Sequence, residues 1–206
     1  MDYKNLKISE YMDALASSAP APGGGPVSAL TCAEGAGLCI MVCELSIGKK
    51  KFEEYDSLLK EVLSNQKKYK DEFLNLMNQD SIDFKEMEKV FKMPKETDEE
   101  KALRNKAMQD AFKTCLVTPL NVVELVLKSI KETKKIVGKS SALASSDLEV
   151  SALMLEAGAK GALVNVKVNT KYMEDKAYAQ EKNKRVDELI NEISKISFEI
   201  LDELRK

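Results

Sequence analysis

Apolar residues recur every three or four positions along almost the whole chain, a spacing that predicts α-helices rather than strands. Prolines, glycines and short polar stretches separate the periodic segments. Helices are therefore expected over about 9–18, 26–47, 52–91, 97–138, 146–169 and 175–204. Pro119 is expected to kink or restart the fourth of them. No internal repeat or low-complexity linker divides the chain, so we predict a single domain over residues 1–206, an all-α bundle of six or seven mostly antiparallel helices.

The segment 26–47 is apolar almost all round, which makes it the one candidate for a membrane span. A spanning helix needs about 20 apolar residues with few or no charges, whereas Glu34 lies in the middle of this segment. We therefore predict a buried central helix and no membrane association. Glu34 is interpreted as an interface or partner-bonded carboxylate, with a catalytic role as the alternative. The small-residue faces of 26–47 and 147–169 predict a second subunit, and hence a homodimer.

A stripe of largely apolar residues follows in alternating steps of three and four, which is the spacing of a heptad repeat. Its members are Phe52, Tyr55, Leu59, Val62, Gln66, Tyr69, Phe73 and Leu76. Continuing the same register places Asp80 and Asp83 where further core residues should stand. Two carboxylates in a core stripe are a local conflict of the kind that functional sites produce. Alternatively, Asp80 caps a new helix that runs to Phe91, and the pattern alone favours neither interpretation.

The segment 146–169 opens with an expected capping box that starts at Ser146. Asp147 and Asn165 are about five helical turns apart, so both side chains point the same way. Asn169 lies one turn further on, and glycines lie between the two ends. One interpretation is the wall of a cleft with a polar group at each end. The other is a tight helix crossing at the glycines, with Asp147 serving the N-terminus and the two asparagines capping the C-terminus.

Histidine is absent from the 206 residues, which excludes Ser-His-Asp and Cys-His nucleophilic systems and His-based zinc sites. Proton transfer in an enzyme of this composition therefore belongs to Asp, Glu, Lys, Tyr or Cys. The 32 basic and 34 acidic residues give a net charge of −2, so no strong basic field is available and we expect no nucleic-acid partner. With 44% hydrophobic residues, the chain is expected to bury a sizeable core.

Four cysteines occur, of which Cys32, Cys39 and Cys43 share one face of the segment 26–47 and Cys115 is distant in the sequence. No C-x-x-C spacing is present, so we predict buried, small apolar side chains and no metal site. The first ten residues show no apolar signal-peptide segment. Free cysteines and this N-terminus together favour a reducing, cytoplasmic location.

Several short motifs follow one another along the chain. They are Ala21-Pro22-Gly23-Gly24-Gly25, Gly48-Lys49-Lys50, Met93-Pro94-Lys95-x-Thr97, Glu99-Glu100-Lys101, Pro119-Leu120, Ser146-Asp147-Leu148 and Asn165-Val166-x-Val168-Asn169. Each is weak alone, but their order and spacing over about residues 5–204 resemble the cyclodeaminase/cyclohydrolase family. That family comprises the C-terminal domain of formimidoyltransferase-cyclodeaminase and the free-standing bacterial methenyltetrahydrofolate cyclohydrolases.

The resemblance implies an all-helical, at least dimeric enzyme that acts on the one-carbon bridge between N5 and N10 of a tetrahydrofolate substrate, with no permanently bound cofactor. An aspartate on which the family's activity depends aligns with Asp80, which implies that Asp80 is the general acid and base. The sequence departs from the family pattern at Pro26, where relatives usually carry Ser. Any substrate contact there is therefore expected from backbone amides.

The resemblance also implies substrate-binding residues. Asp147 would orient the pterin or the water, while Asn165 and Asn169 would hydrogen-bond the pterin edge. A helix N-terminus offers free N–H groups for a carboxylate of the glutamate tail. The residues implied for the tail are Gly23, Gly24 and Gly25, with Lys49 for another carboxylate.

The implied reaction is hydrolysis of 5,10-methenyltetrahydrofolate to 10-formyltetrahydrofolate. Cyclodeamination of 5-formimidoyltetrahydrofolate, with release of ammonia, is the alternative within the family, and it needs the same single carboxylate. A chain without a transferase domain favours the cyclohydrolase. A more distant alternative is a non-enzymatic helical oligomer or adaptor that uses the heptad stripe for association.

Overall fold

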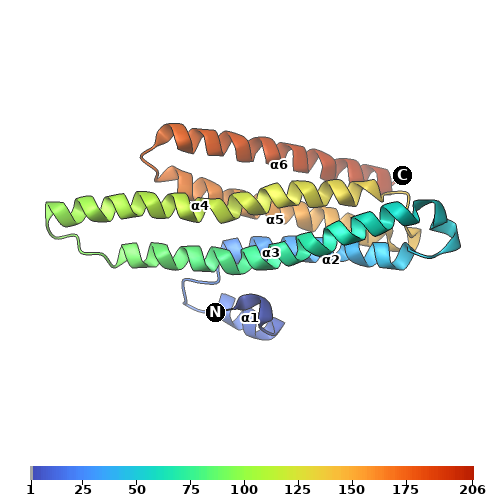
Figure 1. Ribbon diagram of the computed structural model, residues 1–206, viewed down its shortest axis with the longest axis horizontal. Helices are drawn as coiled ribbons and strands as arrows, with labels where there is room; N and C mark the ends of the chain where they lie inside the picture. Colours follow the sequence, from blue (N-terminus) through green and yellow to red (C-terminus); the bar gives the residue numbers. More distant parts are fainter. Residues whose placement is uncertain (1) are drawn as a thin grey trace.

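A computed structural model describes residues 2–206 and contains, in that part of the chain, six α-helices and no strand. The helices are α1 (Ile8–Leu15), α2 (Gly24–Ser46), α3 (Asp56–Phe91), α4 (Asp98–Lys135), α5 (Ser145–Lys171) and α6 (Lys176–Leu204). Short 3-10 segments cover Tyr3–Asn5, Lys50–Tyr55 and Ala142–Ala144. The helices α2 to α6 run back and forth as a long bundle, whereas α1 lies beside it near the N-terminus (Figure 1). The predicted all-α bundle is confirmed, and the homodimer stays a prediction.

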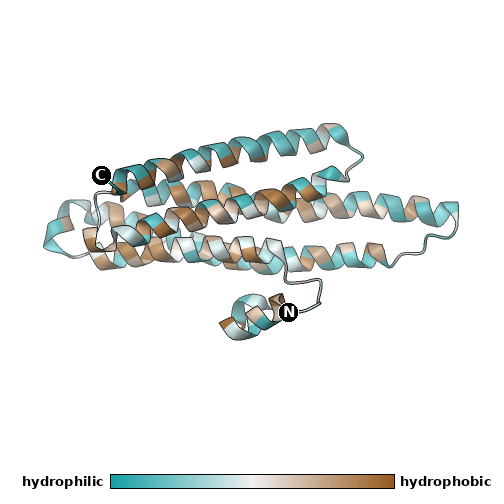
Figure 2. Ribbon diagram, turned by 180° about the vertical axis from the view of Figure 1, so that it is seen from behind, coloured by the Kyte–Doolittle hydropathy of each residue, from teal (hydrophilic) through white to brown (hydrophobic). Residues whose placement is uncertain are grey.

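The helix α2 lies at the centre of the bundle, where it packs against both α3 and α5. The helix α4 packs against α3 and α5, and α6 covers α4 and α5 (Figure 1). Apolar residues concentrate along the middle of the bundle, while polar residues cover α6 and the two ends (Figure 2). A helix that is apolar almost all round is stable only with neighbours on most of its sides. The central place of α2 follows from that composition.

The crossing of α2 and α5 depends on small residues. A Cβ atom on Gly158 would overlap Cys32 Sγ, and one on Gly161 would overlap Ser28 Oγ. The backbones also approach closely enough for Ser151 Oγ to donate a hydrogen bond of 2.7 Å to the carbonyl of Gly35. These glycines therefore serve a tight helix crossing, and the interpretation of them as the floor of a cleft is wrong.

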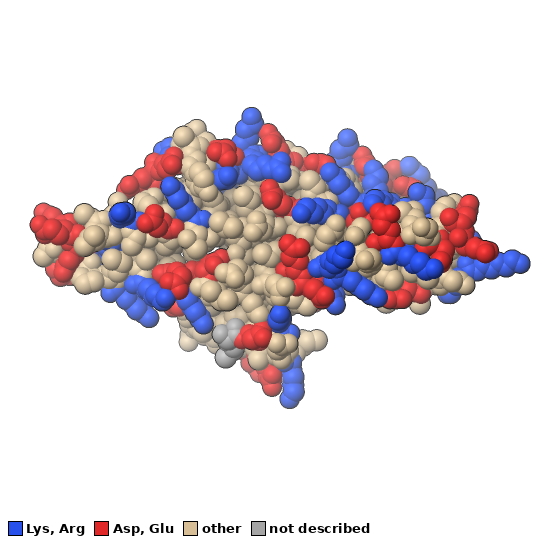
Figure 3. All heavy atoms as spheres, viewed as in Figure 1, with Lys and Arg blue, Asp and Glu red and all other residues tan. Residues whose placement is uncertain are grey.

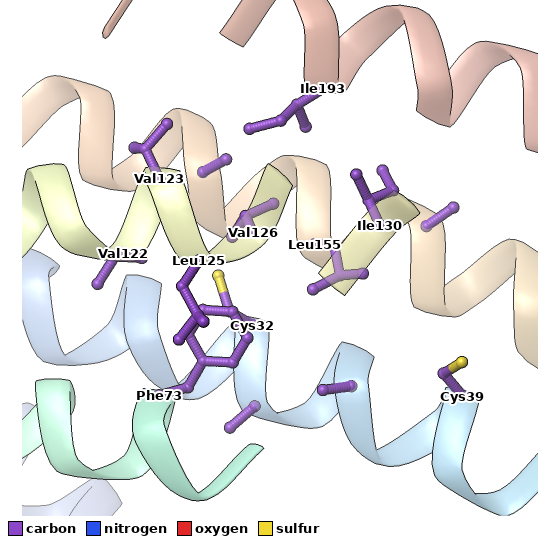
Figure 4. Packing of buried hydrophobic residues seen from close by; sticks show 14 of the residues in the cluster. Cys32, Cys39, Phe73, Val122, Val123, Leu125, Val126, Ile130, Leu155 and Ile193 are labelled. Carbon is purple, nitrogen blue, oxygen red and sulfur yellow. The ribbon is translucent and has the colours of Figure 1, made fainter. Parts of the chain in front are cut away.

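The core draws on every helix of the bundle. In Figure 4, Phe73 of α3 points toward Cys32 of α2 and lies next to Leu125 of α4. Leu155 of α5 and Ile193 of α6 continue the core on the other side, and both are fully buried. The predicted burial of the cysteines is confirmed for Cys32, Cys39 and Cys43, which are free thiols.

Three predicted helix ends need correction. The helix α3 runs without a break through Asp80 to Phe91, so Asp80 does not cap a new helix. The helix α5 begins at Ser145 without a side-chain cap, because the 3-10 segment Ala142–Ala144 leads directly into it; the predicted capping box at Ser146 is wrong. The same helix continues to Lys171, so its asparagines do not cap the C-terminus.

The capping box at the start of α4 is confirmed. The backbone N–H of Glu100 donates to Thr97 Oγ1 over 3.2 Å, and the N–H of Thr97 donates to Glu100 Oε2 over 3.1 Å. These two bonds satisfy N–H groups that have no acceptor within the helix.

The surface and the central helix bear on possible partners. Basic and acidic side chains are interspersed on the face in Figure 3, without a continuous basic patch. Within residues 2–206, α2 is the one helix long and apolar enough to cross a membrane by length and composition. It is packed between α3 and α5, as a core helix of this composition would be. Glu34 lies on its exposed side.

Candidate active site

A cavity of about 620 Å³ opens between α3, α4 and the C-terminal end of α5. Most of the surface of its lining is apolar, as is typical of small-molecule sites, although half of the lining residues are polar. The polar lining residues are Asp80, Asn105, Gln109, Cys115, Asn165, Asn169 and Glu174. The apolar and aromatic ones are Phe84, Met87, Phe91, Met108, Phe112, Val168 and Tyr172. Three of the predicted site residues, Asp80, Asn165 and Asn169, therefore line one cavity.

Asp80 lies against the N-terminus of α2. A Cβ atom on Gly25 would overlap the carboxyl group of Asp80, so the carboxylate reaches this position because residue 25 has no side chain. A Cβ atom on Gly24 would lie 3.7 Å from Asn165 Nδ2. The N–H groups in the first turn of a helix have no acceptor within the helix and carry partial positive charge. The glycine run thus brings a helix N-terminus, a carboxylate and an amide together.

The electrostatics of Asp80 suit proton transfer near neutral pH. Burial, and secondly the negative charge of Asp83, raise the pKa of Asp80 from 3.8 to about 6. No hydrogen bond to the carboxylate from residues 2–206 offsets these two effects. A carboxyl group with a pKa close to the working pH both accepts and returns a proton efficiently.

Asp83 lies one helical turn further along α3 and has a different environment. Its side chain is buried, with 8% of the residue exposed. Gln79 Nε2 donates to its Oδ1 over 2.7 Å, and Thr118 Oγ1 donates to its Oδ2 over 2.5 Å. Because both oxygens accept hydrogen bonds inside the protein, Asp83 influences the site through its charge on Asp80 rather than by contact with a ligand.

Asn165 and Asn169 stand one turn apart on α5. Asn165 Nδ2 donates to the carbonyl of Gly161 over 3.0 Å. Asn169 Nδ2 donates to the carbonyls of Asn165 and Cys115, over 3.0 and 3.1 Å. A carbonyl only accepts hydrogen bonds, so the atoms that face these carbonyls are the NH₂ groups. The two amide oxygens are thereby left as acceptors for a ligand in the cavity.

Aromatic side chains form the outer part of the cavity. The rings of Phe112 and Tyr172 are stacked, with centroids 5.9 Å apart and planes inclined by 22°. Tyr172 and Phe91 are 56% and 53% exposed, which leaves their rings available at the mouth. Such rings provide apolar contact area for a planar ligand.

The charge of the cavity is negative. Among the lining residues only Asp80 and Glu174 are charged, and none is a lysine or arginine. Glu174 is held at the edge: its Oε1 accepts from Asn105 Nδ2 over 2.7 Å, and its N–H donates to Gln109 Oε1 over 2.8 Å. Within residues 2–206, no three Cys, Asp or Glu side chains converge on a point that could hold a metal ion.

The structure does not bring Lys49 to this cavity. Lys49 lines a second, smaller pocket with Gly48, whose N–H donates to Asp56 Oδ1 over 2.9 Å. Asp56 begins α3, and at 1.5 Å per residue it is about 36 Å from Asp80. The placement of Lys49 beside the same substrate is therefore wrong, because the long helix α3 separates the two ends of the bundle.

Asp147 and the three glycines Gly23, Gly24 and Gly25 also stand outside the cavity lining. Asp147 is in the first turn of α5, about 27 Å along the helix from Asn165. The shared face was predicted correctly, but the length of the helix keeps Asp147 away from Asp80 and leaves it to complement the helix N-terminus. Gly23 is the N-cap of α2, and a Cβ atom there would meet only Pro20 O, at 4.0 Å.

Sequence reasoning missed several groups of the site. One of them is Cys115, which lines the cavity. Burial, with the charges of Asp83 and Asp80, raises the pKa of its thiol to about 11, so this group is neutral at ordinary pH. The α4 lining residues follow a helical spacing of three and four that was a usable signal: Asn105, Met108, Gln109 and Phe112. Thr118, which binds Asp83, had no such signal because its partner is distant in sequence.

The chain is similar to several known proteins in sequence and in fold. The family whose model matches residues 7–188 is described as formiminotransferase-cyclodeaminase. Methenyltetrahydrofolate cyclohydrolase from Methylorubrum extorquens is 35% identical over 98% of this chain and 97% of that protein. Formimidoyltransferase-cyclodeaminase from Gallus gallus is 33% identical, and the match covers 97% of this chain but 37% of that protein. The crystal structure of formiminotetrahydrofolate cyclodeaminase from Thermotoga maritima has the same fold, with a TM-score of 0.87 at 21% identity over 98% of this chain and 97% of that chain.

Proposed function

This chain belongs to the formiminotransferase-cyclodeaminase family, and on that premise we propose that it is a folate enzyme that hydrolyses 5,10-methenyltetrahydrofolate to 10-formyltetrahydrofolate. One relative, 35% identical over nearly the full length of both proteins, is named as the cyclohydrolase. The observation that carries the proposal is Asp80, a carboxylate with a pKa of about 6 in a cavity that Asn165 and Asn169 also line.

The first step is the addition of water to the one-carbon bridge. The methenyl bridge carries a positive charge shared between N5 and N10, and its carbon is open to attack. Ionised Asp80 stabilises that charge and accepts a proton while the water oxygen bonds to the bridge carbon. The product of this step is a neutral adduct with a hydroxyl group on the bridge carbon.

The second step opens the ring. The bond between the bridge carbon and N5 breaks, and Asp80 returns its proton to N5. The hydroxyl group loses its proton to water as the formyl C=O bond forms, so one proton is released overall. A pKa of about 6 lets one carboxyl group perform both transfers without a histidine.

The remaining cavity residues bind the substrate. The amide oxygens of Asn165 and Asn169 accept hydrogen bonds from the N–H groups of the pterin edge. The aromatic mouth at Phe112 and Tyr172 contacts the aminobenzoyl ring. Because the lining contains no lysine or arginine, the carboxylates of the glutamate tail point out of the cavity. This assignment replaces the tail site expected at the glycine run, where a carboxylate would face Asp80.

Cyclodeamination is the second candidate, and the match to the Gallus gallus protein favours it. In that reaction N10 of 5-formimidoyltetrahydrofolate attacks the formimidoyl carbon, and ammonia leaves after protonation. Asp80 would supply the proton, so the same cavity serves either substrate. The identity of the starting material, rather than the catalytic group, separates the two activities.

The test is to add the protein to 5,10-methenyltetrahydrofolate and follow the loss of its near-ultraviolet absorbance. We expect decay well above the rate in buffer, and Asp80→Asn protein purified in parallel reports any contaminating activity. If the methenyl compound is stable, 5-formimidoyltetrahydrofolate is supplied and ammonia is measured. Ammonia release would replace the first proposal by the second. Inactivity in both assays would refute both enzyme assignments and leave the non-enzymatic adaptor as the remaining interpretation.

We also propose that the protein acts in the cytoplasm as a homodimer. Support for the homodimer comes from exposed apolar residues on two neighbouring helices, Met41 and Leu45 on α2 and Leu153 and Val164 on α5. Burying such side chains against a second copy is favourable. A monomeric mass by light scattering at the concentration of the activity assay would contradict the dimer.

A further inference from the structure

Pro119 lies in the interior of α4, which continues as a helix from Asp98 to Lys135. Proline has no N–H group, so it cannot donate to the carbonyl four residues earlier, and its ring also crowds that carbonyl. The carbonyl in question belongs to Cys115, a residue that lines the cavity. Pro119 therefore removes the helical donor from one backbone carbonyl at the site.

A side chain of another helix supplies the missing donor. Asn169 Nδ2, on α5, donates to the carbonyl of Cys115 over 3.1 Å and to that of Asn165 over 3.0 Å. Both protons of the amide are thus used, and the amide is fixed at two points. Its oxygen is the atom left to face a ligand.

We propose that Pro119 is a positioning residue for ligand binding: by freeing the carbonyl of Cys115, it anchors the Asn169 amide so that the amide oxygen faces the cavity. The anchoring is a property of the folded chain, whereas its effect on folate binding rests on the proposed function. An isolated asparagine on a helix samples several rotamers, and ordering it only on binding lowers affinity. Because Pro119 keeps the Asn169 amide ordered before a ligand binds, that loss of affinity is avoided.

A purely structural role for Pro119 is the competing explanation. The same segment of α4 holds α3, because Thr118 Oγ1 donates to Asp83 Oδ2 and Cys115 Sγ donates to the carbonyl of Asp83. A bend in α4 could serve these contacts alone. The two explanations differ in whether the effect of replacing Pro119 depends on Asn169.

The experiment is a double-mutant cycle with Pro119→Ala and Asn169→Ala, measured with 5,10-methenyltetrahydrofolate. Pro119→Ala restores the N–H that competes for the Cys115 carbonyl, and alanine is a better helix former than proline. We expect KM to rise about tenfold in either single variant, with kcat changed less than about twofold, as for loss of one hydrogen bond that binds substrate and transition state alike. In the Asn169→Ala background, Pro119→Ala should raise KM further by less than about twofold. An equal rise in KM in both backgrounds, or no rise in either, would overturn the proposal.

A second readout needs no substrate. The side-chain amide of Asn169 gives a pair of nitrogen–proton resonances that Asn169→Ala identifies by their disappearance. Pro119→Ala should shift this pair and speed its hydrogen exchange, while Val117→Ala, at a neighbouring exposed position of α4, should leave it unchanged. If Pro119→Ala lowers the unfolding temperature, Pro119→Val carries the same N–H and fills more of the space.

Unaltered amide resonances in a folded Pro119 variant would overturn the anchoring whatever the protein's substrate is. A protein without any folate activity would instead refute the proposed function and leave this measurement to decide the role of Pro119.

Discussion

Gln66 and Asp80 are polar residues of the same stripe on α3, about 21 Å apart along the helix, and their surroundings differ in one decisive respect. Gln66 is fully buried, yet its amide is saturated. Its Nε2 donates to the carbonyl of Ser129 over 2.8 Å and to Thr133 Oγ1 over 3.1 Å, while its Oε1 accepts from Ser129 Oγ over 2.7 Å. A buried polar group satisfied in this way fixes the register of two helices.

Asp80 has no comparable set of partners. Its carboxylate lies in an open cavity, and burial and the charge of Asp83 disfavour its ionised form. The comparison shows that a polar interruption in a core stripe identifies a functional site only when its hydrogen bonds are left for a ligand. Three experiments test this difference, beginning with the largest expected effect.

Asp80→Asn should reduce turnover at least about 100-fold, the usual scale for loss of an acid–base group. The protein should remain folded, because the amide replaces a carboxylate whose charge the site disfavours. Absorbance decay of the methenyl substrate measures the activity, and circular dichroism checks the fold. Asp71→Asn, on the exposed side of α3, is the matched control and should retain full turnover. Full activity of Asp80→Asn would remove Asp80 from the mechanism.

Gln66→Leu should have the opposite profile. The substitution leaves Ser129 and Thr133 without their partner and should lower the free energy of unfolding by about 1–3 kcal/mol. Turnover per folded molecule should stay within about twofold, since Gln66 is distant from the cavity. Urea unfolding measures the loss, and Gln180→Leu on the exposed side of α6 should change it by less than about 0.5 kcal/mol. A stable but inactive Gln66→Leu protein would break the contrast between the two positions.

The pH dependence should show the smallest effect. With a pKa of about 6 for Asp80, kcat/KM should rise with pH through a midpoint near 6, because the ionised form is the base. Asp83→Asn removes a negative neighbour, so the pKa of Asp80 falls and the midpoint moves to lower pH. The shift should be less than about one pH unit, since burial is the larger cause and remains. Glu86→Gln, on the exposed face of α3, should leave the midpoint in place, and a midpoint unmoved by Asp83→Asn would show that the two carboxylates do not interact.

Much of the fold was predictable because the apolar spacing typical of a helix is a local feature of the sequence. The spacing of apolar residues gave the helices, and the register of the α3 stripe placed Asp80 and Asp83 on its inner side, as the structure confirms. The capping box at Thr97 was also read correctly. By contrast, the box expected at Ser146 failed, because a preceding 3-10 segment supplies the start of α5.

The errors at the site have a common cause. Lys49 and Asp147 were grouped with Asp80 through motifs, and the lengths of α3 and α5 carry them to other parts of the bundle. Cys115, Thr118 and the aromatic mouth were missed because their relation to Asp80 is made across helices. Periodicity defines which face of a helix a residue occupies, but it contains no information on which neighbour that face meets.

Composition and the spacing of apolar residues were enough to establish the helical class, the absence of histidine chemistry and the position of two carboxylates on the inner side of one helix. The packing of the helices was needed to show that Gln66 has hydrogen-bond partners where Asp80 has none, and that Gly25 makes room for the Asp80 carboxyl group. It was also needed to show that the Cys115 carbonyl meets Asn169. Helix propensity and periodicity act within a few residues along the chain. Hydrogen-bond partners, burial and the pKa of a carboxyl group depend instead on atoms that the packing of distant segments brings within a few ångströms.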